Sequence, residues 1–131
     1  MSRQRVASGG PWESVYGYSR AVRAGDRVFV SGTTAATADG MVDSPGDATA
    51  QARRCFAIIE KALADAGASL ADVVRTRMFI TDAAYSDAVG RVHGEVFEEI
   101  RPAATMVVVA ALIDPRLLVE IEADAVVDSG Q

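Results

Sequence analysis

The stretch Arg101–Val126, RPAATMVVVAALIDPRLLVEIEADAV, decides how the rest of the sequence is interpreted. Most of it belongs to two apolar runs, Thr105–Leu112 and Leu117–Val127, which are separated by a short link that contains Pro115. Short runs rich in β-branched residues on either side of a proline turn are typical of β-strands. The first run is almost continuously apolar, which predicts a strand that is buried on both faces of a sheet.

The second run alternates between apolar and acidic side chains. Its apolar positions are Val119, Ile121, Ala123 and Ala125, and its acidic positions are Glu120, Glu122 and Asp124. A period of two places these sets on opposite faces of a strand. Three neighbouring carboxylates repel one another unless water or hydrogen-bond donors reach them. We therefore expect the acidic face to be either a solvated edge or the wall of a polar cleft.

Composition narrows the class of protein. A chain of 131 residues and 13.7 kDa with 50% hydrophobic and 24% charged residues is typical of one soluble globular domain, here residues 1–131. The net charge of −5 argues against a nucleic-acid partner. The single cysteine, Cys55, excludes an internal disulfide. Because the chain has only one histidine and one cysteine, a zinc site is not expected. Without a secretion signal or a membrane-length apolar run, we expect a cytoplasmic protein with no metal, cofactor or membrane partner.

The remaining patterns predict the order of the other elements. They indicate an edge strand at Arg3–Ala7, a hairpin of Ser19–Ala24 and Arg27–Thr33, a loop from Thr34 to Gly46, a helix from Asp47 to Ala66, a strand at Val73–Thr81 and a helix at Ser86–Ile100. Asp47 is a suitable N-cap, Gly67 a suitable residue after the first helix, and Pro102 ends the second. The alternation in Val73–Thr81 predicts Val74, Thr76, Met78 and Ile80 on one face. This order favours an α+β fold, a mixed sheet with both helices on one face.

Three segments resemble those of the YjgF/RidA family of reactive-intermediate deaminases. RPAATMVVV followed by LVEIEADAVV is similar to the family's C-terminal signature. Tyr16–Ala21 with Gly25–Thr33 resembles its G-P-Y…G-x-x-V-F-V-S-G-Q segment, and Val73–Asp82 resembles its central strand, V-K-x-x-V-F-V-x-D. The resemblance implies a chorismate-mutase-like fold and a homotrimer with small-molecule clefts between subunits. An apolar sheet face left open by the helices also calls for a partner.

The resemblance also implies a site for imine hydrolysis. In that pocket an arginine holds the substrate carboxylate, a glutamate acts on water, and a tyrosine and a Ser-Gly turn complete the wall. Residue by residue, the resemblance implies that Glu120 is the catalytic residue. It implies that the substrate-binding residues are Tyr18, Ser31, Gly32, Thr33, Ala104 and Thr105, where Thr33 replaces the family's glutamine. Ala104 stands where the motif P-A-R-[ST] has its arginine, and losing that contact costs several kcal/mol, so standard 2-imino acid deaminase activity is not expected.

The sequence leaves several alternatives open. Arg20 or Arg77 is available to replace the missing arginine. The function is either hydrolysis of a reactive enamine, imine or related carbonyl compound, or non-catalytic binding of a metabolite by a regulatory trimer. Structural roles also compete with functional ones: Glu120 as a solvated strand acid, Tyr18 as a packed hairpin aromatic, and Thr105 as a strand residue with a satisfied hydroxyl.

Overall fold

The computed structural model of the chain describes residues 3–37 and 39–128. Its elements are β1 (Arg3–Val6), α1 (Trp12–Tyr16), β2 (Ala21–Ala24), β3 (Arg27–Thr33), α2 (Ala48–Asp65), β4 (Val73–Ile80), α3 (Ser86–Phe97), β5 (Ala103–Val108) and β6 (Val119–Val126). Two 3-10 turns, η1 (Leu70–Asp72) and η2 (Ala83–Tyr85), precede β4 and α3. The strands form one sheet in the order β1-β2-β3-β6-β4-β5, in which only β4 and β5 run parallel.

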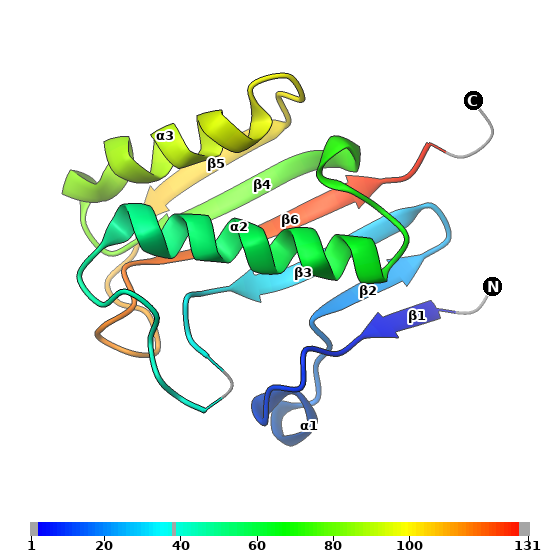
Figure 1. Cartoon of the computed structure of the whole chain (residues 1–131), viewed down its shortest axis with the longest axis horizontal. Coiled ribbons are helices and arrows are strands. Elements are labelled where there is room, and N and C mark those ends of the chain that lie inside the picture. Colours follow the sequence, from blue (N-terminus) through cyan, green and yellow to red (C-terminus); the bar gives the residue numbers. More distant parts are fainter. Residues whose placement is uncertain (1–2, 38, 129–131) are drawn as a thin grey trace.

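Helices α2 and α3 lie on the same face of this sheet (Figure 1). The α+β fold that the sequence predicts, a mixed sheet with two helices on one face, is therefore confirmed. The alternation in β6 is confirmed as well, because the four predicted apolar positions, Val119, Ile121, Ala123 and Ala125, are buried and the three acids are only partly so. The core between sheet and helices includes Ile59 and Leu63 of α2, Val89 and Val92 of α3, and Val119, Ile121, Ala123 and Ala125 of β6. Asp47 caps α2 as expected, accepting a hydrogen bond from the Ala50 N–H at 3.0 Å.

The predicted alternation along β4 is wrong at its first residues. Val73 is buried and Val74 is 47% exposed, the reverse of the expected faces. The register between β4 and β6 shifts between Val73 and Arg75, which inserts one extra residue into β4. Such a bulge changes the face on which the preceding side chains lie. A period of two read from the sequence does not reveal it.

The prediction that the run Thr105–Leu112 is buried on both faces is also wrong for this chain. Its strand, β5, lies at the edge of the sheet and ends at Val108. Val107 is 42% exposed and Val108 is 56% exposed. An edge strand has only one neighbouring strand within its chain. The apolar side chains of this run therefore stay partly exposed in a single chain.

Helix α1 is a further element that the sequence analysis does not predict. Three of its five residues, Trp12, Val15 and Tyr16, carry exposed apolar side chains, and the rings of Trp12 and Tyr16 stack with centroids 5.5 Å apart. The helix ends at Gly17, which has φ +75° and donates its N–H to the Glu13 carbonyl. Among the helices of the described residues, none is long and apolar enough to span a bilayer.

Cys55 lies on the buried side of α2, and we expect its thiol to be inert in the folded protein. Its Sγ donates a hydrogen bond to the Thr33 carbonyl at 3.2 Å, and burial raises the pKa of the thiol to about 12. The thiolate, which is the reactive form, is therefore scarce at neutral pH. Ellman's reagent at about pH 8 should label no thiol in the native protein and one thiol per chain in denaturant. Rapid labelling of the native protein would contradict this assignment.

Candidate functional site

A cavity of about 990 Å³ lies beside the N-terminal half of the sheet. Its walls are α1, the residues that join β1 to β2, the end of β3, one side of α2, the loop that follows β3 and the start of β6. In Figure 1, α1 and the loop after β3 lie at the same end of the molecule, below α2 and the sheet. This volume is within the usual range for a small-molecule site, although it is open to solvent.

Glu120 lies in this cavity at the start of β6 and is half-buried. Its neighbours Val119 and Ile121 are fully buried in the core, so the strand holds the glutamate backbone in place. No described residue donates a hydrogen bond to its carboxylate, whereas Arg77 donates to both Glu122 and Asp124. Burial raises the pKa of Glu120, and the charge of Arg20 opposes that rise. The arrangement leaves a carboxylate that is free to accept a proton.

Gly32 lets the β3 backbone approach Glu120. A Cβ added at Gly32 would collide with Glu120 Oε2 and would lie 3.1 Å from Glu120 Cδ. The register between β3 and β6 shifts between Val30 and Thr33, which brings Gly32 to the cavity wall. The observed position of the Glu120 carboxylate therefore depends on the absence of a Cβ at residue 32, and not on an unusual backbone angle, because Gly32 is not among the residues with positive φ.

Arg20 lies on the same wall, immediately before β2. Its Nη2 donates a hydrogen bond to the Gly32 carbonyl at 2.6 Å. Burial lowers the pKa of Arg20, and nearby acidic groups including Glu13 and Glu120 oppose that change. The described residues nevertheless show no ion pair between Arg20 and Glu120. A cation and an anion thus share one wall without neutralising each other directly.

The structure brings together only part of the predicted site. Glu120, Gly32 and Tyr18 line the cavity. Ser31 and Thr33 are not among its lining residues: Ser31 Oγ donates to the Ser19 carbonyl, and Thr33 is fully buried and donates to the Ser31 carbonyl. Ser31 and Thr33 thus hold the irregular end of β3 around Gly32.

Ala104 and Thr105 are separated from Glu120 within one chain. Both lie on β5, and β4 stands between β5 and β6. Arg77, on β4, is also outside the cavity lining, and its guanidinium is 3.1 Å from Glu122 and 3.4 Å from Asp124. A single chain therefore does not place position 104 beside the glutamate.

Sequence reasoning missed the aromatic side of the cavity. Trp12 and Tyr16 of α1 and Ile113 in the loop before β6 all line it and are more than half exposed. The available signal was a concentration of aromatic residues in WESVYGY, within an otherwise polar N-terminal segment. These apolar groups give the cavity a second wall that is chemically distinct from the one formed by Arg20 and Glu120.

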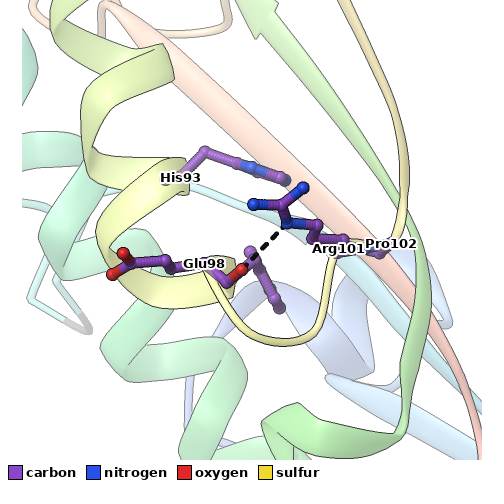
Figure 2. Close-up of a pocket in the computed structure, with 6 residues that line it drawn as sticks. His93, Glu98, Arg101 and Pro102 are labelled. Atoms are coloured by element: carbon purple, nitrogen blue, oxygen red, sulfur yellow. Dashed lines mark hydrogen bonds between the residues drawn. The ribbon is translucent and has the colours of Figure 1, made fainter.

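A smaller hollow of about 390 Å³ lies at the end of α3 and is lined by His93, Gly94, Phe97, Glu98, Arg101 and Pro102. Figure 2 shows Arg101 turned back toward the helix, where its Nε donates to the Glu98 carbonyl at 3.1 Å. His93 Nε2 is 2.8 Å from Thr76 Oγ1, and its ring packs against Phe97. Burial lowers the pKa of His93, which favours a neutral ring. These contacts close the helix end, so the larger cavity is the better candidate site.

The chain is similar to proteins of one family over most of its length. The family described as Endoribonuclease L-PSP matches residues 11–127. The uncharacterized protein SCO2049 of Streptomyces coelicolor is 44% identical over 122 residues, covering 93% of this chain and 90% of that protein. The 3-aminoacrylate deaminase RutC of Acinetobacter baylyi is 38% identical over 104 residues, covering 79% of this chain and 82% of that protein.

Solved structures of the same family are similar to this chain as well. The crystal structure of Rv2704 from Mycobacterium tuberculosis, a member of the YjgF/YER057c/UK114 family, is 53% identical with a TM-score of 0.87 and covers 96% of this chain and 100% of that one. The structure of Escherichia coli TdcF with bound serine is 29% identical with a TM-score of 0.77 and covers 95% and 94%. The family match, the identities and the shared architecture lead to one conclusion: this chain belongs to the YjgF/RidA family and has its chorismate-mutase-like fold.

Proposed function

We propose that the chain forms a RidA-like homotrimer with small-molecule clefts between subunits, in which Glu120 acts in the hydrolysis of a reactive enamine, imine or related carbonyl compound. The observation that carries this proposal is the half-buried Glu120 carboxylate, which faces the cavity without a hydrogen-bond donor from the described residues. Ionisable groups with perturbed pKa values in a cavity are often catalytic. A relative named as a 3-aminoacrylate deaminase supports enamine chemistry.

The proposed reaction uses Glu120 as a general base. The carboxylate accepts a proton from water while the water oxygen bonds to the imine carbon, and the C=N electron pair moves to nitrogen. Nitrogen takes up a proton, which gives a carbinolamine. Glu120 and solvent then transfer protons as the C–N bond breaks, so that ammonia leaves and a carbonyl compound remains. An enamine enters the same route after it tautomerises to the imine.

Exposed apolar side chains on the sheet support the trimer. Val107 and Val108 are exposed on the edge strand β5, and Phe29 is exposed on the interior strand β3. Strand β5 and strand β1, whose Val6 lines the cavity, lie at opposite ends of the strand order. A neighbouring subunit would therefore cover β5 and place Ala104 and Thr105 beside the Glu120 cavity of another chain. Sedimentation equilibrium should give three times the 13.7 kDa mass of the chain.

Ammonia release is the direct test of the reaction. The purified protein would be offered 2-iminopropanoate, 3-aminoacrylate and uncharged imines generated in the assay. We expect hydrolysis of at least one of them and a rate for Glu120→Gln that is lower by about 10²- to 10⁴-fold, the usual contribution of a general base. Glu122→Gln is the matched control, since Glu122 lies on the same strand but pairs with Arg77. The absence of any rate that Glu120→Gln removes would refute the proposal.

The pH dependence follows from the raised pKa of Glu120. A general base must be deprotonated, so kcat/KM should fall as the pH is lowered through the Glu120 pKa. Because burial raises that pKa, the decline should begin at a higher pH than for an ordinary glutamate, whose reference value is 4.5. The pH–rate profile from about pH 4 to 8 checks this. An acid limb at or below the ordinary glutamate value would contradict it.

Ala104 favours a second candidate function, a non-catalytic metabolite-binding or regulatory trimer. Loss of the motif arginine would remove standard 2-imino acid deaminase activity and leave the cavity. This alternative predicts that a ligand raises the melting temperature without being consumed. Stabilisation without turnover would select it over the enzyme, and turnover that depends on Glu120 would exclude it.

The variant Ala104→Arg tests the proposed assembly. If position 104 of one subunit faces the Glu120 cavity of the next, the new guanidinium can bind a substrate carboxylate. We expect kcat/KM for 2-iminopropanoate to rise by roughly tenfold or more relative to wild type. The same substitution at Ala57, on the α2 wall of the cavity, provides a control for added charge. No gain from Ala104→Arg would contradict the placement of β5 beside the cavity of a neighbouring subunit.

A further inference from the structure

We propose that Arg20 is the anion-binding residue of the Glu120 cavity and that the cavity therefore prefers a ligand that carries a carboxylate over an uncharged one. This inference rests on the proposed function, because it takes the Glu120 cavity as the ligand site. It identifies a cation that replaces the arginine absent at Ala104. Arg20 and Arg77 are equal candidates in the sequence, but only Arg20 lines the cavity.

The backbone at Arg20 is held from both sides. Its N–H donates to the Val6 carbonyl at 2.8 Å, and its carbonyl accepts from the Ser31 N–H at 3.0 Å. The side chain is held as well, by the 2.6 Å hydrogen bond from Nη2 to the Gly32 carbonyl. A guanidinium that is fixed before binding loses less conformational entropy when an anion binds. Arg20 is thus preorganised at the point where Gly32 meets Glu120.

Arg20 is also the cavity cation that lacks an anionic partner. The described wall contains two other cations, Arg54 and Lys61, and these pair with Asp43 at 3.8 Å and with Asp65 at 2.8 Å. Their side chains are 47% and 77% exposed, whereas Arg20 is mostly buried. The Nε of Arg20 is buried and has no hydrogen-bond partner among the described residues. A guanidinium that is partly withdrawn from water without an ion pair is less stable than one in solvent, and a ligand carboxylate would offset that cost.

The position of Arg20 relative to Glu120 limits the chemistry of the ligand. Both groups border Gly32, one through its carbonyl and the other through the space that a Cβ would occupy. A ligand whose carboxylate binds Arg20 therefore brings the carbon next to that carboxylate toward Glu120. An imine carbon directly attached to a carboxylate, or one carbon removed from it, meets this requirement. An uncharged imine would leave the guanidinium without its partner.

Binding of pyruvate and pyruvamide tests the assignment without turnover. The two molecules differ only in the charge and hydrogen bonding of the carboxylate, and pyruvate resembles the carbonyl product. By calorimetry on the full-length protein, wild type should prefer pyruvate by roughly 10- to 100-fold, as expected for hydrogen bonds to a charged group. Arg20→Met should reduce this preference to about twofold or less, and Arg20→Lys should retain part of it because it keeps the charge.

Two further arginines serve as comparisons. Arg53→Met removes a surface charge that pairs with Glu95, and it should leave the preference unchanged. Arg77→Met removes the other candidate cation and should also leave it unchanged. The proposal is overturned if wild type shows no preference for pyruvate, if Arg20→Met retains the preference, or if Arg77→Met loses it. Circular dichroism shows whether each variant folds. If Arg20→Met does not fold, Arg20→Lys tests the proposal instead, because it should bind pyruvate with a preference between that of wild type and none.

The outcomes separate this inference from the proposed reaction. Glu120→Gln reports on hydrolysis, whereas the pyruvate preference reports on the cation. Hydrolysis that depends on Glu120 together with a preference that survives Arg20→Met would keep the enzyme and reject the role of Arg20. An Arg20-dependent preference without any turnover would keep the anion site and reject catalysis.

If the enzyme is active, the pH at which kcat/KM falls on the acid side provides a second test of Arg20. Because Arg20 lowers the pKa of Glu120, Arg20→Met should move this fall to higher pH.

Discussion

The variant Gly32→Ala is expected to lose most of the proposed hydrolase activity while keeping its fold. A Cβ at this position would collide with Glu120 Oε2, so the carboxylate must rotate away from its place in the cavity. The end of a glutamate side chain moves at little cost, and Gly32 does not have positive φ, so we expect stability to change by less than about 1 kcal/mol. A misplaced base is expected to lower kcat/KM by about 100-fold. Ammonia release and thermal unfolding measure the two effects.

Gly94→Ala is the matched control for this prediction. Gly94 lies within α3, and a Cβ added there would meet no atom within 4 Å apart from its chain neighbours and the backbone of its own helix. Alanine at an interior helix position should stabilise the protein by about 0.5–1 kcal/mol and leave activity unchanged. Full activity of Gly32→Ala would show that Glu120 does not act from its observed position, and would count against its catalytic role.

The variant Gln51→Leu is expected to cause a large loss of stability. Gln51 is fully buried on α2, where its Oε1 accepts from the Leu118 N–H at 2.9 Å. Its Nε2 donates to the carbonyls of Ser44 and Arg116, so one side chain joins the helix to both loops beside the cavity. Leucine has a similar volume but leaves the buried Leu118 N–H unpaired. We expect the free energy of unfolding to fall by about 3 kcal/mol.

Urea unfolding at a fixed protein concentration measures this loss, because association would otherwise change the apparent stability. Gln4→Leu is the matched control. Gln4 is exposed on β1 and its Nε2 donates to the Asp65 carbonyl at 2.8 Å, so its replacement should cost less than about 1 kcal/mol. Equal urea midpoints for the two variants would contradict the role given to Gln51. Because Leu118 precedes Glu120 by two residues, Gln51→Leu should also reduce activity.

Much of the fold was predictable because its signals are local. The alternation in β6, the Asp47 cap and the glycine after α2 each depend on a few consecutive residues. The resemblance of three segments to one family extended those local signals to the whole sheet. The bulge in β4 and the exposure of β5 were not predictable in this way, since both depend on which strands become neighbours.

The candidate site was predictable only in part. The family resemblance implied that Glu120 and Gly32 belong to one pocket, and they meet there because β3 and β6 pair. Thr33 is fully buried, although it directly follows Gly32, because the irregular register at the end of β3 turns it toward the core. The contribution of Trp12 was missed because a five-residue helix has too weak a periodic pattern to recognise.

By itself, the sequence determined the two long helices, the order of the strands along the chain, the acidic face of β6 and the family, because periodicity, capping and motif order are properties of the chain read from end to end. Only the tertiary structure decided which charges remain free. Arg77 lies on β4 opposite the acids of β6 and is paired with Glu122 and Asp124. Arg20 instead reaches the Gly32 carbonyl across the hairpin and lines the cavity that holds Glu120. The two arginines differ because electrostatic pairing depends on distance through space, which strand order and register set and sequence separation does not.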